Sequence, residues 1–257
     1  MEPALALLVL SGVAGPVFAG PPLITDDPDT PGKNHWEINV AYTLDLSARV
    51  GSDGRTWEHG APLVDLNYGF LENDQLKLEF PVEILDPAGG EGARAGIGDA
   101  LLGYKFRFID EESAPFSLSV YPQVGIPIGD EDRGLGTGDA SLRLPVQIGR
   151  HLLDDRLFLY ADAGYEEQFA RGESDSWFGG IAAEYALTDR FTLCGEVRYE
   201  HHLRGESGPG DDWLFNIGAK WRLGESATLM GALGRSFDPE PDSGSSLLAY
   251  FGVQFAF

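Results

Sequence analysis

Two adjacent histidines, His201 and His202, are the first candidates for chemistry, because imidazole is a common metal ligand. The residues around them alternate between apolar and polar, as in a β-strand, where consecutive side chains face opposite sides. The two imidazoles cannot then chelate one ion together. We therefore expect no metal site at this pair.

Acidic and glycine-rich loops supply the other candidates. The acidic run 130–132 and Asp139 offer hard oxygen ligands for Ca²⁺, but without a regular ligand spacing. The glycines near 96–98 and 134–138 are spaced like those of phosphate-binding loops, but no helix follows either group, and the helix N-terminus is what binds phosphate. We expect solvated loops, no cofactor and no catalytic residue here.

Composition excludes several classes of protein. Lys and Arg number 18 against 41 Asp and Glu, a formal net charge of −23, so the chain would repel nucleic acid. Cys194 is the single cysteine, which excludes a disulfide scaffold. The body of the chain has no apolar run of about 20 residues, as a membrane-spanning helix requires.

A period of two runs through almost the whole chain. In the stretch that begins at Trp36, Ile38 and Val40 are apolar while Glu37 and Asn39 between them are polar. A strand separates such sets onto two faces, whereas a helix would mix them. Twelve segments show the pattern; the weakest covers residues 226–235.

Short and long connections alternate between these segments. Short turns occur at 71–74, 110–114, 150–155, 188–190 and 224–226, and longer loops at 48–55, 86–96, 129–138, 166–174, 203–210 and 236–244. This alternation is typical of barrels in a bacterial outer membrane. The sequence predicts an all-β, transmembrane antiparallel barrel of about twelve strands, with short periplasmic turns and long extracellular loops.

Aromatic residues mark both ends of the predicted strands. Eight residues at about 3.3 Å each span roughly 26 Å, close to the apolar band of such barrels once strand tilt is included. Trp177 and Tyr185 have this separation on one face. We predict interfacial positions for Trp36, Trp177, Tyr185, Phe191, Tyr199, Trp213, Trp221 and Phe257.

The ends of the chain fit export. Residues 1–19 combine a short apolar stretch with Val17-Phe18-Ala19, which suits cleavage after Ala19, although no Lys or Arg precedes the stretch. We expect a signal peptide at 1–19, a periplasmic segment at 20–34 that caps or partly plugs the mouth, and the barrel at 35–257. The terminal Phe257 resembles the signal read by the barrel-assembly machinery. Lipid and lipopolysaccharide are the other expected partners.

The polar face of the strands should line a lumen. The predicted pore-lining residues are Glu37, Glu79, Lys105, Arg107, Arg143, Asp162, Glu184, Glu196, Arg198, Lys220 and Arg222. Opposite charges in a narrow barrel should pair, because unpaired buried charge is costly. The whole of this face also includes Asp45, Asp65, Glu83, Asp99, Glu200, Asp212 and Lys77. It then holds 11 acidic residues against 7 basic ones, so we predict a weak preference for cations.

Three segments resemble one family of outer-membrane proteins, the MetA-pathway phenol-degradation type. They are residues 22–28 (PLITDDP) with the following HWE at 35–37, residues 96–99 (GIGD) with GYK at 103–105, and residues 127–139 (PIGD to GTGD). The resemblance implies an outer-membrane barrel of a Gram-negative bacterium that moves small solutes, aromatic ones included.

Three functions compete. The first is a passive channel for small, aromatic or hydrophobic solutes. The second is a lipase-like barrel enzyme, which needs a Ser and a His together on the outer face; His201 lies there, but no neighbouring strand offers a Ser at its level. The third is a structural barrel with an occluded lumen.

Overall fold

The computed structural model describes residues 21–48, 55–86, 92–169, 174–203, 210–237 and 245–257. The expected signal peptide and most of the long loops lie outside these ranges. The strands are β1 (His35–Ala48), β2 (Arg55–Gly69), β3 (Asp74–Asp86), β4 (Arg94–Ile97), β5 (Ala100–Ile109), β6 (Ser117–Val120), β7 (Gln123–Ile126), β8 (Ser141–Leu152), β9 (Leu157–Gln168), β10 (Ser176–Thr188), β11 (Phe191–His202), β12 (Gly210–Arg222), β13 (Ala227–Phe237) and β14 (Ser245–Ala256). One 3₁₀ turn, η1 (Glu131–Arg133), lies in the loop after β7.

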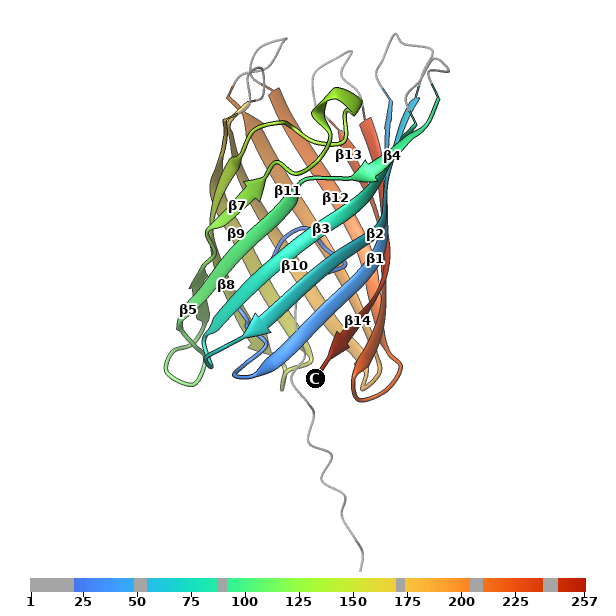
Figure 1. Cartoon of the computed structure of the whole chain (residues 1–257). Helices are drawn as coiled ribbons and strands as arrows, with labels where there is room; N and C mark the ends of the chain where they lie inside the picture. Colours follow the sequence, from blue (N-terminus) through green and yellow to red (C-terminus); the bar gives the residue numbers. More distant parts are fainter. Residues whose placement is uncertain (1–20, 49–54, 87–91, 170–173, 204–209, 238–244) are drawn as a thin grey trace, which may run out of the picture.

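These strands form one closed antiparallel barrel, in which β14 pairs with β1 along the whole of β1 after its first two residues (Figure 1). β4 and β5, which both pair with β3, together make up one interrupted spanning strand, and β6 and β7, which both pair with β5, make up another. The barrel therefore has 12 spanning strands, as predicted. The weak segment is confirmed as a strand, β13, which pairs with β12 and β14. None of the described residues forms a helix long and apolar enough to cross a membrane.

Local chemistry explains both interruptions. Pro122, between β6 and β7, has no N–H to give to the ladder. Between β4 and β5, the Asp99 carboxylate accepts hydrogen bonds from the backbone N–H of Gly129 at 2.9 Å and of Thr137 at 2.7 Å. It ties the loop after β7 to the wall at the point where the strand breaks.

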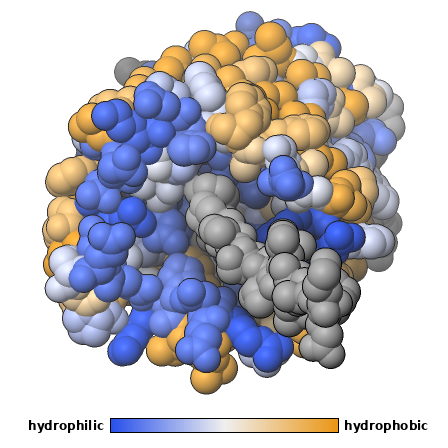
Figure 2. Space-filling model, turned by 90° about the horizontal axis from the view of Figure 1, so that it is seen from below, coloured by the Kyte–Doolittle hydropathy of each residue, from blue (hydrophilic) through white to orange (hydrophobic). Residues whose placement is uncertain are grey.

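The period of two sorts the side chains as the sequence predicts. Ile181 and Ile217 point outward and are 70% and 73% exposed, whereas Glu184 and Asn216 point inward and are buried. Exposed apolar residues on this scale are rare on soluble monomers and indicate a surface that meets lipid. Figure 2, a view onto the end that carries the C-terminus, shows hydrophilic residues around the mouth and hydrophobic ones on the outer flank.

The predicted interfacial aromatics lie at two levels. Near the long loops, Tyr199 packs against Trp213 at 4.9 Å between ring centroids, and Trp177 packs against Tyr165. Near the short turns, Phe191 lies opposite Trp221, with Tyr185 at the same end of β10. Trp36 and Phe257 also lie at the short-turn end, where each backbone N–H donates to the other residue's carbonyl.

Candidate functional site

The inner wall of the barrel is polar, and many of its side chains are buried. Seven of the predicted pore-lining residues face the lumen and are buried: Glu37, Lys105, Asp162, Glu184, Glu196, Arg198 and Lys220. Three more, Glu79, Arg107 and Arg143, are half-buried on the same face. Arg222 lies two residues beyond Lys220, at the short-turn end of β12. The lumen therefore brings together residues from every part of the chain.

Ion pairs connect charged residues of strands that are separated by one other strand. Arg198 on β11 contacts Asp162 at 3.1 Å, and Lys220 on β12 contacts Glu184 at 2.8 Å. The first pair lies across β10, where Gly180 is opposite both partners, and the second pair lies across β11. Because pairing offsets the cost of burying charge, these contacts allow the charged side chains to lie buried on the inner wall.

The N-terminal segment, residues 21–31, fills part of this lumen (Figure 1). It lies deeper than the expected position at the periplasmic mouth, and Thr25 and Asp27 are completely buried. The backbone N–H groups of Ile24 and Thr25 donate to the two carboxylate oxygens of Glu196, at 2.9 and 2.6 Å. A single carboxylate of β11 thus holds two consecutive backbone groups of the segment.

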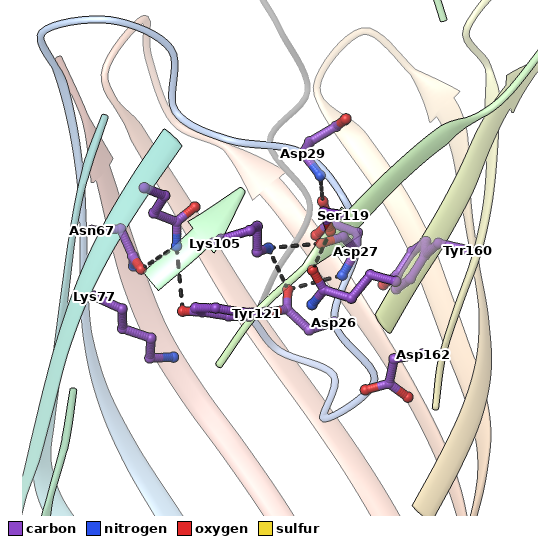
Figure 3. Close-up of polar contacts among 12 residues, drawn as sticks. Asp26, Asp27, Asp29, Asn67, Lys77, Lys105, Ser119, Tyr121, Tyr160 and Asp162 are labelled. Carbon is purple, nitrogen blue, oxygen red and sulfur yellow. Dashed lines mark hydrogen bonds and ion pairs between the residues drawn. The ribbon is translucent and has the colours of Figure 1, made fainter. Parts of the chain in front are cut away.

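Two basic side chains of β5 hold the rest of the segment. The Lys105 ammonium donates to the Asp27 carbonyl at 2.7 Å and contacts the Asp26 carboxylate at 3.3 Å, as Figure 3 shows. Arg107 contacts Asp29 at 3.0 Å. Lys105 and Arg107, both predicted from the sequence to line the pore, therefore pair with acidic residues of the segment.

The pKa values of the two adjacent carboxyl groups of the segment are shifted in opposite directions. Burial raises the pKa of Asp27 well above its usual range, even though the Lys105 ammonium acts against it. Burial acts in the same direction at Asp26, but the ammonium groups of Lys105 and Lys77 together hold its pKa below the usual value.

The segment also makes apolar contacts with β9, β10 and β11. Leu23 packs in a buried cluster with Phe158, Tyr160, Ala182 and Cys194. The predicted pore-lining set does not include Phe158. The signal was present: residues 157–160 (LFLY) are apolar or aromatic on both faces. A strand with two apolar faces packs against something on its inner side as well.

Small residues let the segment approach the wall closely. A Cβ atom at Gly180 of β10 would overlap the Thr25 side chain, and one at Gly149 of β8 would lie 2.9 Å from ring carbons of Pro28. At both positions glycine is required by the close approach of the segment.

A cavity of about 480 Å³ remains in the lumen beside this segment. Its lining includes Asp26 and Lys105 at the segment and Asp45, Glu58 and Glu83 on β1 to β3. A cavity of this size holds a small organic molecule.

Replacing Lys105 by Met should loosen the segment. The substitution leaves the Asp26 carboxylate and the Asp27 carbonyl without their cation, and removing one partner of a buried ion pair costs roughly 3–5 kcal/mol. Since the Asp26 side chain is 28% exposed, we expect a loss at or below the lower end of that range. Denaturant unfolding of the refolded barrel measures it. Lys33→Met, at an exposed position of the same chain, is the control and should change little.

Several solved structures share the fold. The COG4313 outer membrane channel from Pseudomonas putida F1 is 15% identical, with a TM-score of 0.70 over 90% of this chain and 98% of that one. The KdgM porin is 12% identical, with a TM-score of 0.52 over 85% and 99%. The CymD monoaromatic hydrocarbon channel is 8% identical, with a TM-score of 0.51 over 88% and 89%. At these identities the likeness establishes the barrel fold.

A comparison with curated protein sequences found no match. A family model does match, over residues 29–251, which include the whole barrel up to the middle of β14. The chain belongs to the family described as "Putative MetA-pathway of phenol degradation".

Proposed function

We propose that this protein is an outer-membrane channel that passes small solutes, aromatic ones included, through a charged lumen narrowed by residues 21–31. The observation that carries the proposal is the cavity of about 480 Å³ inside a barrel that is apolar outside and polar inside. The COG4313 channel and the monoaromatic hydrocarbon channel among the structures of the same fold support it. Removal of residues 1–19, and recognition of Phe257 during assembly, are parts of the same proposal.

A barrel with an occluded lumen is the second candidate, because residues 21–31 occupy part of the passage. The enzyme alternative has less support. His201 lies opposite Trp177 on β10 and pairs with Asp211 on β12 at 2.7 Å, so neither neighbouring strand places a serine opposite it. An acid next to a histidine without a nucleophile does not make a hydrolase.

Conductance of the refolded protein in a planar bilayer tests the proposal. We expect discrete openings in KCl, and entry of small aromatic solutes into proteoliposomes above the rate for protein-free vesicles. A barrel that folds but gives neither conductance nor solute entry would favour the occluded structure.

The reversal potential in a salt gradient should show a weak preference for cations. Carboxylates outnumber basic groups in the cavity lining, and charged rings in a narrow pore select by sign. The preference should fall at high ionic strength, because salt screens the lining charges. Strong anion selectivity would contradict this prediction.

A further inference from the structure

The cavity beside residues 21–31 carries an unbalanced charge. Its lining contains nine carboxylates, at Asp26, Asp29, Glu37, Asp45, Glu58, Asp65, Glu79, Glu83 and Asp162, and three basic side chains, at Lys77, Lys105 and Arg143. All three basic groups already have carboxylate partners: Lys77 contacts Asp65 and Glu79, Lys105 contacts Asp26, and Arg143 contacts Glu166. Two further lining carboxylates, Asp29 and Asp162, pair with Arg107 and Arg198. Among the described residues this leaves Glu37, Asp45, Glu58 and Glu83 without a basic partner, and their charge is available to a ligand.

Three of the lining carboxylates lie side by side without a cation. Asp45 on β1 is directly opposite Glu58 on β2, and Glu83 follows on β3 opposite Gly60. Like charges opposite each other on neighbouring strands are unfavourable. Asp45 has a hydrogen bond with Ser246, but among the described residues no basic side chain forms an ion pair with any of the three. A bound cation would remove this repulsion.

Buried oxygen atoms in the same lining independently lack a donor. Asp65 and Asn216 are 3% and 6% exposed, and the Oδ1 atom of each side chain has no hydrogen-bond partner. Their other polar atoms are engaged: Asp65 Oδ2 contacts Lys77 at 3.3 Å, and Asn216 Nδ2 donates to Glu196 at 3.1 Å. Asp45 Oδ1 is a third acceptor of this lining without a partner, while Gln147 Nε2 and the Tyr250 hydroxyl are the unpartnered groups of the described lining that can donate. The three acceptors outnumber the two donors, so the site favours a ligand that donates hydrogen bonds.

The rest of the lining limits the kind of cation. Leu44, Leu63 and Leu248 border the cavity, so a ligand would meet apolar surface as well as carboxylates. Within the described ranges, no three metal-ligating side chains come together at one point. The arrangement fits an ammonium group with an apolar body better than a bare metal ion.

We propose that this cavity binds small organic ammonium ions, in which a protonated amine meets the carboxylates of β1 to β3 and an apolar body meets the leucines. The inference rests on the proposed channel function and names the class of solute that the channel selects. Neutral or anionic molecules of the same shape should bind more weakly, because they leave the carboxylates unpaired.

Benzylammonium, benzyl alcohol and benzoate form a matched set of probes with one ring and three charges. Binding to the detergent-solubilised barrel, followed by ligand-observed NMR, needs no conductance and therefore tests this inference separately from the channel. We expect benzylammonium to bind at least about tenfold more tightly than benzyl alcohol, as one retained ion pair implies, and benzoate not to bind. In a bilayer, benzylammonium should also reduce the potassium current.

The double variant Asp45→Asn with Glu58→Gln should weaken benzylammonium binding several-fold. It removes a like-charge contact, so the barrel should fold at least as well as the parent. Asp189→Asn with Glu225→Gln makes the same charge change in exposed short turns and should leave binding unchanged. Equal binding of the three probes, or an unaffected double variant, would overturn the inference even if the channel conducts. Charge-selective binding to a barrel that does not conduct would support the site and count against the channel.

Discussion

Deletion of residues 21–31 is expected to raise the single-channel conductance several-fold. The segment fills the lumen at the level of Glu196 and Lys105 and buries its own Thr25 and Asp27 there. Without it, water and ions occupy that volume, and the wall charges that it neutralised face the passage. Conductance of the refolded deletion variant in a planar bilayer measures the change.

A control separates removal of the segment from shortening of the chain. Replacing residues 21–31 by a glycine–serine sequence of equal length keeps the connection to β1 but removes the groups that contact Glu196, Lys105 and Arg107. This variant should conduct like the deletion, with more current noise, because a flexible chain moves within the pore. If both variants conduct like the parent protein, residues 21–31 do not restrict the passage.

Gly180→Ala should displace the same segment by adding one methyl group to the wall. A Cβ atom at this position would overlap the Thr25 side chain, and Thr25 has no free space because it is completely buried. Forcing an extra carbon into a packed site typically costs about 1–3 kcal/mol. We expect higher or more variable conductance, together with easier protease cleavage of the N-terminal segment.

The neighbouring Gly179 provides the matched control for this substitution. It lies on the same strand but faces the other side, and a Cβ atom there would meet its nearest neighbour, the Asp162 carbonyl, at an ordinary 3.4 Å. Gly179→Ala should therefore behave like the parent. Thr25→Ala, which removes the overlapping hydroxyl, should partly restore the parent conductance in the Gly180→Ala background. Equal behaviour of the two alanine variants would contradict this account of the contact.

Much of the wall could be derived from the sequence because strand periodicity is local. Each residue's face follows from its neighbours two positions away, so Ile181 could be placed outside and Glu184 inside without knowledge of the partner strands. The same local pattern predicted the number of spanning strands and the outward aromatics such as Trp177 and Trp213. It also placed Glu196, Lys105 and Arg198 in the lumen.

The roles of those lumen residues could not be derived in this way. Glu196 holds the backbone of Ile24 and Thr25 across 172 and 171 residues of sequence. Such contacts depend on the closure of the barrel, which brings distant segments to the same depth. Phe158 is an example. The sequence shows an apolar residue on the inner face of its strand, but it does not show that Leu23 packs against it.

The sequence by itself therefore determined the barrel, the two faces of its wall and the charged character of its lumen, because each follows from alternation along single strands. Only the tertiary structure decided that residues 21–31 lie inside, which charges pair there, and which carboxylates of β1 to β3 remain without a cation. The physical reason is that the alternation of residues along a strand decides which of its faces points outward and which points into the lumen. The contents of the interior depend on strands and segments that meet only after the barrel closes.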